Sequence, residues 1–145
     1  MQTLRLPYYD IAPELTESLR SIGTNLEKST LGIPLIELVY LRISQINGCD
    51  FCLRLHGQKL FAAGESEARM QDLEQWRGSP VFLARERAAL NWAESLTRID
   101  VTHAPDQDYE PLTQHFNNTE ITELTFAIVT MNALNRLAIG MRRTR

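Results

Sequence analysis

The stretch from Glu37 to His56 reads ELVYLRISQINGCDFCLRLH and contains a carboxylate, two thiols and an imidazole. The pair Asn47-Gly48 is typical of a helix end, so we expect one helix to stop there and another to start at Cys49. Cys49, Cys52 and His56 then occupy positions i, i+3 and i+7 of the second helix. This spacing puts both thiols and the imidazole on one helical stripe.

Glu37 lies ten residues before Asn47, and His56 lies eight residues after Gly48. If the two helices fold back as an antiparallel hairpin, the carboxylate and the imidazole lie level with each other. A base that is oriented by a carboxylate and directed at a thiol activates a cysteine nucleophile. Lowering the pKa of a thiol by two units takes about 2.7 kcal/mol, which a helix N-terminus and a paired imidazolium can supply together.

A disulfide between Cys49 and Cys52 would close within the first helical turn. Cβ atoms three residues apart on a helix are about 5–6 Å apart, whereas a disulfide needs roughly 3.5–4.5 Å. We therefore expect a strained, easily reduced bond of the catalytic or regulatory kind. Two alternatives to a redox-active cysteine pair remain. The residues are either two buried thiols beside an unrelated histidine, or the ligands of a zinc site. Structural zinc needs four ligands and the sequence has no second CxxC, so we predict no metal and no cofactor.

The stretch resembles the core motif of the alkylhydroperoxidase D-like (AhpD-like) branch of the carboxymuconolactone decarboxylase superfamily. The matching positions are Glu37, Arg42, Ser44, Asn47, Cys49, Cys52 and His56. The resemblance implies an all-α fold, a peroxide-reducing or disulfide-exchange activity, and assembly into homo-oligomers, either trimers or hexamers. By position, Cys52 resembles the peroxidatic thiol, Cys49 the resolving thiol, His56 the base and Glu37 the residue that orients it.

Other positions support or vary this motif. Some members of the family carry a histidine between the cysteines as part of a proton relay, and here Asp50 and Phe51 occupy those positions. Ser44 shares the Glu37 face at i+7, so it either hydrogen-bonds near the site or packs between helices. Asn47 is expected to end one helix and cap the next. Arg42 belongs to the motif, but the sequence indicates no specific partner for it.

Length and composition predict one domain over residues 1–145, with residues 1–13 as an N-terminal arm in extended or turn conformations rather than a helix. A net charge of −3 argues against a nucleic-acid surface. No apolar run approaches the eighteen residues of a membrane span, and MQTLRLPYYD lacks the apolar core of a secretory signal. We therefore expect a cytoplasmic protein, where two cysteines indicate redox or metal chemistry rather than a structural disulfide.

The apolar periodicity is helical throughout, and no segment has the alternation of a convincing strand. We predict an all-α domain of six to seven helices built around the antiparallel hairpin. After the N-terminal arm, residues 14–28 should form one amphipathic helix. The expected later helices span residues 34–46, 49–63, 66–78, 80–98, 106–116 and 119–140. His103 and His115 fall in polar segments and are expected to be solvated.

The motif predicts a thiol-dependent peroxidase. In this hypothesis His56, held by Glu37, deprotonates Cys52; the thiolate attacks a hydroperoxide, and Cys49 condenses the sulfenic acid to a disulfide that a dithiol donor reduces. The alternative is a redox switch or disulfide-exchange protein that uses the same cysteine pair with little turnover. Decarboxylation of a muconolactone is a third hypothesis, disfavoured because that branch of the superfamily generally lacks this cysteine pair. No nucleic-acid or membrane partner is predicted.

Overall fold

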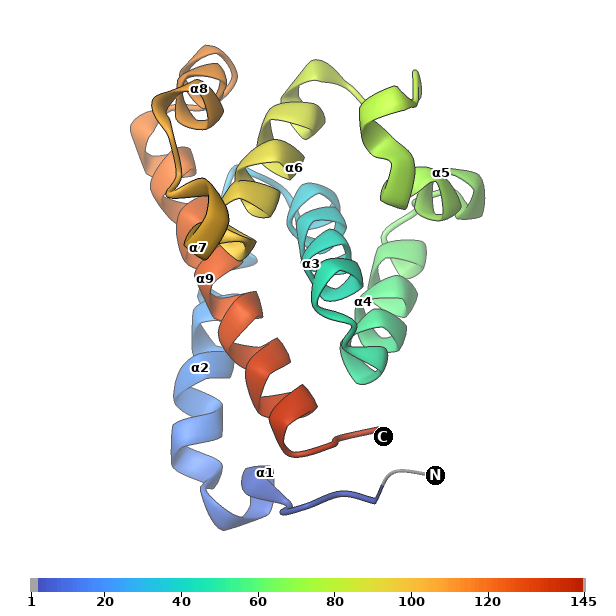
Figure 1. Ribbon diagram of the computed structural model, residues 1–145, viewed down its shortest axis with the longest axis vertical. Coiled ribbons are helices and arrows are strands. Elements are labelled where there is room, and N and C mark those ends of the chain that lie inside the picture. Colours follow the sequence, from blue (N-terminus) through green and yellow to red (C-terminus); the bar gives the residue numbers. More distant parts are fainter. Residues whose placement is uncertain (1–2, 145) are drawn as a thin grey trace.

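Helix α3 (Ile33–Asn47) forms the centre of the fold. The computed structural model describes residues 3–144, and in it the ten residues of α3 from 35 to 44 are all buried. They are covered because α4, α6 and α9 pack around α3, as Figure 1 shows. A buried residue run of this kind is expected for a helix that is apolar on more than one side.

Within residues 3–144 the structure contains nine α-helices, two 3-10 helices and no strand, which confirms the predicted all-α fold. Three of the nine are single turns of four residues, so six longer helices remain. In chain order the elements are α1 (Tyr8–Ile11), α2 (Pro13–Leu26), α3 (Ile33–Asn47), α4 (Asp50–Ala62), α5 (Glu67–Asp72), η1 (Leu73–Gly78), α6 (Ala84–Thr97), α7 (Ile99–Thr102), α8 (Asp106–Tyr109), η2 (Glu110–Gln114) and α9 (Asn118–Gly140).

Side-chain caps fix several helix starts at the predicted places. Ser66 Oγ accepts a hydrogen bond from the backbone N–H of Arg69 at 3.2 Å and starts α5. At α9, Asn117 Oδ1 accepts from the N–H of Glu120 at 2.8 Å, and Glu120 Oε1 accepts from the N–H of Asn117 at 3.1 Å. This reciprocal pair is a capping box, which satisfies two backbone donors at once.

Several expectations about local structure are wrong. The helices expected over residues 66–78 and 106–116 each divide into a short α-helix and a 3-10 helix. The helix expected from Pro80 starts four residues later, at Ala84, where Glu86 Oε1 accepts a hydrogen bond from the N–H of Leu83 at 2.8 Å and so caps the helix start. The N-terminal arm is not wholly extended, since Tyr8–Ile11 form one helical turn. Residues 1 and 2 of that arm lie outside the described residues.

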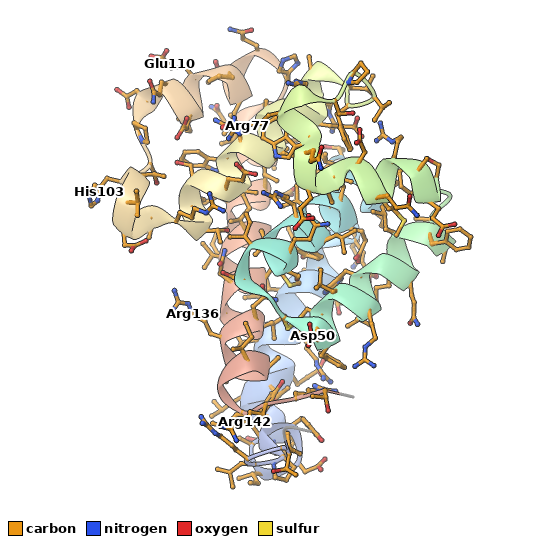
Figure 2. All side chains as sticks on the ribbon, turned by 45° about the vertical axis from the view of Figure 1, so that its right-hand side comes forward. Asp50, Arg77, His103, Glu110, Arg136 and Arg142 are labelled. Atoms are coloured by element: carbon orange, nitrogen blue, oxygen red, sulfur yellow. A yellow bond between two sulfur atoms is a disulfide. The ribbon has the colours of Figure 1, made fainter. Side chains whose placement is uncertain are left out.

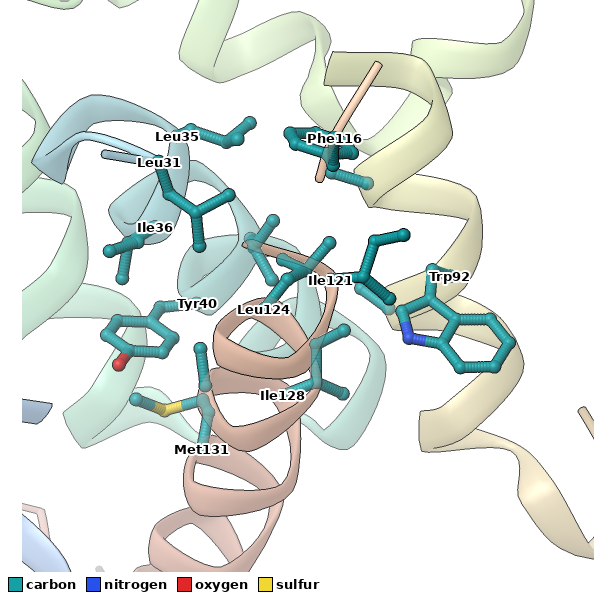
Figure 3. Packing of buried hydrophobic residues seen from close by; sticks show 14 of the residues in the cluster. Leu31, Leu35, Ile36, Tyr40, Trp92, Phe116, Ile121, Leu124, Ile128 and Met131 are labelled. Carbon is teal, nitrogen blue, oxygen red and sulfur yellow. The ribbon is translucent and has the colours of Figure 1, made fainter. Parts of the chain in front are cut away.

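The main hydrophobic core lies between α3, α6 and α9 (Figure 3). Its largest contributors from α9 are Leu124, Ile128 and Met131, which are at most 1% exposed. Met131 lies beside Tyr40 of α3, and Trp92 of α6 closes the opposite side. This core fixes α3 and therefore the position of the hairpin. Among residues 3–144, no helix is both long and apolar enough to cross a membrane.

Candidate active site

The turn between α3 and α4 places the first cysteine at a helix N-terminus. Gly48 adopts the left-handed conformation (φ 69°, ψ 39°) that favours glycine, and the N–H of Cys49 donates back to the Ser44 carbonyl at 3.1 Å. Cys49 is the N-cap residue of α4, and its Sγ accepts from the N–H of Cys52 at 3.4 Å. Both sulfurs therefore lie where the helix dipole favours a thiolate.

Cys49 and Cys52 are joined by a disulfide, with their Cα atoms 5.3 Å apart. Their surroundings differ. Both side chains are buried, but Cys52 lines a large cavity, open to solvent, that is described below, and Cys49 does not. A molecule in the cavity therefore meets Cys52 and not Cys49, which packs with Cys52 and Ala138.

The hairpin brings the base and the carboxylate together. His56 Nδ1 and Glu37 Oε2 are 2.7 Å apart, and both side chains are buried. A carboxylate only accepts hydrogen bonds, so an ionised Glu37 holds the proton on Nδ1 and leaves Nε2 of His56 as the basic nitrogen. Cys52 and His56 are four residues apart on α4 and share a face. The arrangement can therefore accept a proton from the thiol at the cavity surface.

Tyr40 lies against the imidazole, which sequence reasoning missed. Its ring contacts the ring of His56 edge to face, with centroids 5.1 Å apart. Burial, reinforced by the charges of Glu37 and Glu27, raises the pKa of Tyr40 well above its usual value, so the phenol stays neutral. Its hydroxyl has no hydrogen-bond partner within the described residues. Tyr40 is one turn after Glu37, a spacing that could have indicated this contact.

The cavity has a volume of about 740 Å³. It is lined by residues of α2, α3, α4 and α9. Four side chains give it a polar inner region: Glu37, Tyr40, Cys52 and His56. Cavities of roughly 300–1,000 Å³ hold small organic ligands, so a molecule larger than hydrogen peroxide fits beside the sulfur.

Asn47 ties the turn to the last helix. Its Nδ2 donates to Oδ1 of Asn132 and to Oδ1 of Asn135, both at 3.0 Å. Asn135 Nδ2 in turn donates to Ser44 Oγ at 3.2 Å, and both of these residues are fully buried. Ser44 therefore supports the turn that carries Cys49 and makes no hydrogen bond to the Glu37–His56 pair. The two asparagines of α9 were visible in the sequence, but nothing there linked them to Asn47.

Arg42 lies away from the cysteines. Its Nε donates to Glu94 Oε1 at 2.9 Å, and Trp76 Nε1 donates to the same oxygen at 2.9 Å. Arg77 reaches the other oxygen of Glu94 at 2.8 Å. Burial pushes the pKa of Glu94 upward, but the hydrogen bonds from Trp76, Arg77 and Arg42 outweigh it and hold the pKa below its usual value. Arg42 joins α3 to α6, a partnership across 52 residues that the motif did not predict.

The remaining histidines lie outside this site, as expected. His103 and His115 are exposed, and Figure 2 shows His103 at the outer edge of the molecule, well separated from Asp50 at the start of α4. Within residues 3–144, no group of three or more His, Cys, Asp or Glu side chains is arranged to hold a metal ion.

Comparison with known proteins gives the family. The family model for the carboxymuconolactone decarboxylase family matches residues 13–95. The uncharacterised protein YdfG of Bacillus subtilis (strain 168) is 31% identical over 137 residues, which cover 94% of this chain and 93% of YdfG. This match extends along nearly the whole of both chains.

Solved structures share the same fold. The crystal structure of ATU0492 from Agrobacterium tumefaciens, a protein of unknown function provisionally described as the antioxidant defence protein AhpD, superposes with a TM-score of 0.93 at 37% identity and covers 97% of both chains. An uncharacterised peroxidase-related protein from Silicibacter sp. TM1040 superposes with a TM-score of 0.82 at 25% identity, covering 92% of this chain and 71% of the other.

Proposed function

The chain belongs to the carboxymuconolactone decarboxylase family and has the AhpD-like fold, and from this premise we propose that it is a thiol-dependent peroxidase that reduces hydroperoxides through Cys49 and Cys52. One observation carries the proposal: Cys52, but not Cys49, lines the cavity, and the hydrogen-bonded pair His56–Glu37 lines it too. The antioxidant and peroxidase-related descriptions of two structural neighbours are consistent with it.

The first step is the attack on the peroxide. His56 Nε2 takes the proton from Cys52 Sγ, and the charge of Glu37 stabilises the imidazolium that forms. The thiolate attacks the terminal oxygen of R–O–O–H, so an S–O bond forms and the O–O bond breaks. Cys52 becomes a sulfenic acid, and the departing alkoxide takes the proton from the His56 imidazolium and leaves as an alcohol.

The second step forms the disulfide. The sulfur of Cys49 attacks Sγ of the Cys52 sulfenic acid, and the hydroxide that leaves takes the Cys49 proton to become water. The bonded pair in the structure corresponds to this oxidised product. A dithiol donor then reduces the pair through a mixed disulfide, ending as a disulfide itself and returning both protein thiols.

Hydroperoxide consumption with excess dithiothreitol tests the proposal. Wild type should turn over and Cys52→Ser should be inactive. In a parallel experiment on pre-reduced protein without dithiothreitol, Cys49→Ser should consume about one equivalent of hydroperoxide and stop at the sulfenic acid, which dimedone labels. If wild type consumes hydroperoxide no faster than Cys52→Ser, the peroxidase proposal is wrong. Should its disulfide then still exchange with dithiols, the redox-switch alternative replaces it.

A further inference from the structure

The cavity is lined by both apolar and polar side chains. Its walls are largely aliphatic, contributed by Leu19 of α2, Leu55 and Ala62 of α4, and Ile36 of α3 among others. Its polar groups, Glu37 and Tyr40 of α3 and Cys52 and His56 of α4, are buried. A substrate that fills this space has an apolar body and presents its peroxide group to Cys52.

The charged residues that line the cavity are mostly cationic. The cations are Arg20 of α2, Lys59 of α4, and Arg143, which follows α9 near the C-terminus of the chain. Against these three cations stand Glu27, which is exposed, and Glu37, which is already paired with His56. The chain as a whole carries a net charge of −3, so this local excess of positive charge opposes the overall balance.

Two of these cations are available to a ligand. Arg20 and Lys59 are exposed, and neither forms an ion pair with any of the residues from 3 to 144. Arg143 is engaged differently, because its guanidinium stacks over Phe51 at 4.0 Å from the ring centroid. Arg20 and Lys59 are therefore the groups most free to bind an anion at the cavity walls.

The helix sets the distance between the two ends of such a molecule. Lys59 lies seven residues after Cys52 on α4, which is two turns along the same face, or about 10 Å at 1.5 Å per residue. Resting on the peroxidase function proposed above, we infer that the substrate is an organic hydroperoxide with an aliphatic body and a carboxylate about 10 Å from the peroxide group, held by Lys59 and Arg20.

Stopped-flow oxidation of the reduced protein tests the inference. The probes are a long-chain fatty-acid hydroperoxide below its critical micelle concentration, the methyl ester of the same molecule, and hydrogen peroxide. An exposed ion pair changes affinity by a factor of about two to five, so two cations should favour the acid over the ester by about four- to twenty-five-fold in the second-order rate constant of oxidation. The preference should shrink as salt is added.

Substitutions test whether Arg20 and Lys59 cause the preference for the acid over the ester. The double variant Arg20→Gln/Lys59→Gln should bring the acid-to-ester ratio close to one while the ester rate stays within about twofold, because the catalytic groups are unchanged. Arg54→Gln is the matched control, since Arg54 is an exposed cation of the same helix that does not line the cavity, and it should keep the wild-type ratio.

The outcomes separate the two proposals. Equal rates for acid and ester in wild type, or an Arg54→Gln effect as large as that of the double variant, would overturn the carboxylate inference and leave the peroxidase function standing. If none of the three hydroperoxides oxidises the protein faster than it oxidises Cys52→Ser, the peroxidase function fails and the substrate inference fails with it.

Discussion

At the scale of single residues, the two cysteines differ in access more than in chemistry. Cys52 lines the cavity, whereas Cys49 does not. In the reduced protein, iodoacetamide should therefore modify Cys52 first, with a rate that rises through a pKa well below 8.5. Mass spectrometry of the partially alkylated protein identifies the site. Preferential labelling of Cys49 would reverse the roles assigned to the two thiols.

The buried hydroxyl of Tyr40 allows a prediction about the free energy of unfolding. Its hydroxyl is buried without a hydrogen-bond partner among the described residues, so Tyr40→Phe removes a desolvated polar group and keeps the ring against His56. We expect urea unfolding to show a stability equal to or greater than wild type. Ser44→Ala is the matched control: it deletes a buried hydroxyl that does accept a bond, from Asn135, and should cost about 1–3 kcal/mol. A similar loss in Tyr40→Phe would mean that the phenol has a partner in solution.

At the scale of elements, the asparagine contacts hold the catalytic turn against α9. Asn47→Ala leaves the side chains of Asn132 and Asn135 without this donor in a buried region. It should lower stability by about 1–3 kcal/mol and slow oxidation of Cys52, because the turn that positions α4 loosens. Asn118→Ala, on the exposed start of α9, should change neither quantity. Loss of stability with an unchanged oxidation rate would show that the turn is held by the backbone alone.

The ion pair between α3 and α6 predicts a dependence on pH. The folded-state pKa of Glu94 is below its ordinary value of 4.5, so its stabilising contribution is present at neutral pH and is lost as the pH falls below 4.5 through the folded-state value. Glu94→Gln should be less stable than wild type at pH 7, and the difference should narrow in acid. Urea midpoints between pH 3 and 7 measure this. A difference that stays constant with pH would mean that the charge of Glu94 contributes nothing.

At the scale of the whole molecule, the question is what covers the apolar surface. Residues 35–44 of α3 are buried within the monomer and are not available to an oligomer interface. Exposed apolar side chains remain on α9, where Phe126 is 56% and Val129 58% exposed, three residues apart. We predict a homo-oligomer, a trimer or hexamer, that buries this face. Phe126→Glu should reduce the mass seen by sedimentation velocity, and a wild-type protein that sediments only as a monomer at micromolar concentration would contradict the prediction.

The local part of this structure was predictable because its signals are local. Asn47-Gly48 predicted the hairpin, and the spacing of Glu37 and His56 predicted their proximity, because both follow from the rise per residue of a helix. The contacts of Arg42 with Glu94 and of Asn47 with Asn135 span 52 and 88 residues and depend on how α6 and α9 pack. Nothing in a single sequence pairs such distant side chains.

The first residue of α6 was difficult to predict from the sequence for a different reason. Proline at the first helical position predicted a start at Pro80, but the helix starts at Ala84, where the Glu86 carboxylate accepts a hydrogen bond from the backbone N–H of Leu83. The capping residue there is a leucine, whose side chain has no hydrogen-bonding group, so the usual residue types gave no signal. The sequence did not predict the cavity either, because its lining residues on α2 and α4 look like an ordinary amphipathic helix surface in the sequence.

The central claim is that Glu37 acts through His56 to activate Cys52. Stopped-flow oxidation by a hydroperoxide of wild type, Glu37→Gln, His56→Ala and the double variant tests it most directly. His56→Ala should slow oxidation by about 10²–10⁴-fold and Glu37→Gln by less, and the double variant should be little slower than His56→Ala, because residues that act as a unit are not additive. Losses that multiply in the double variant would show that Glu37 does not act through the imidazole.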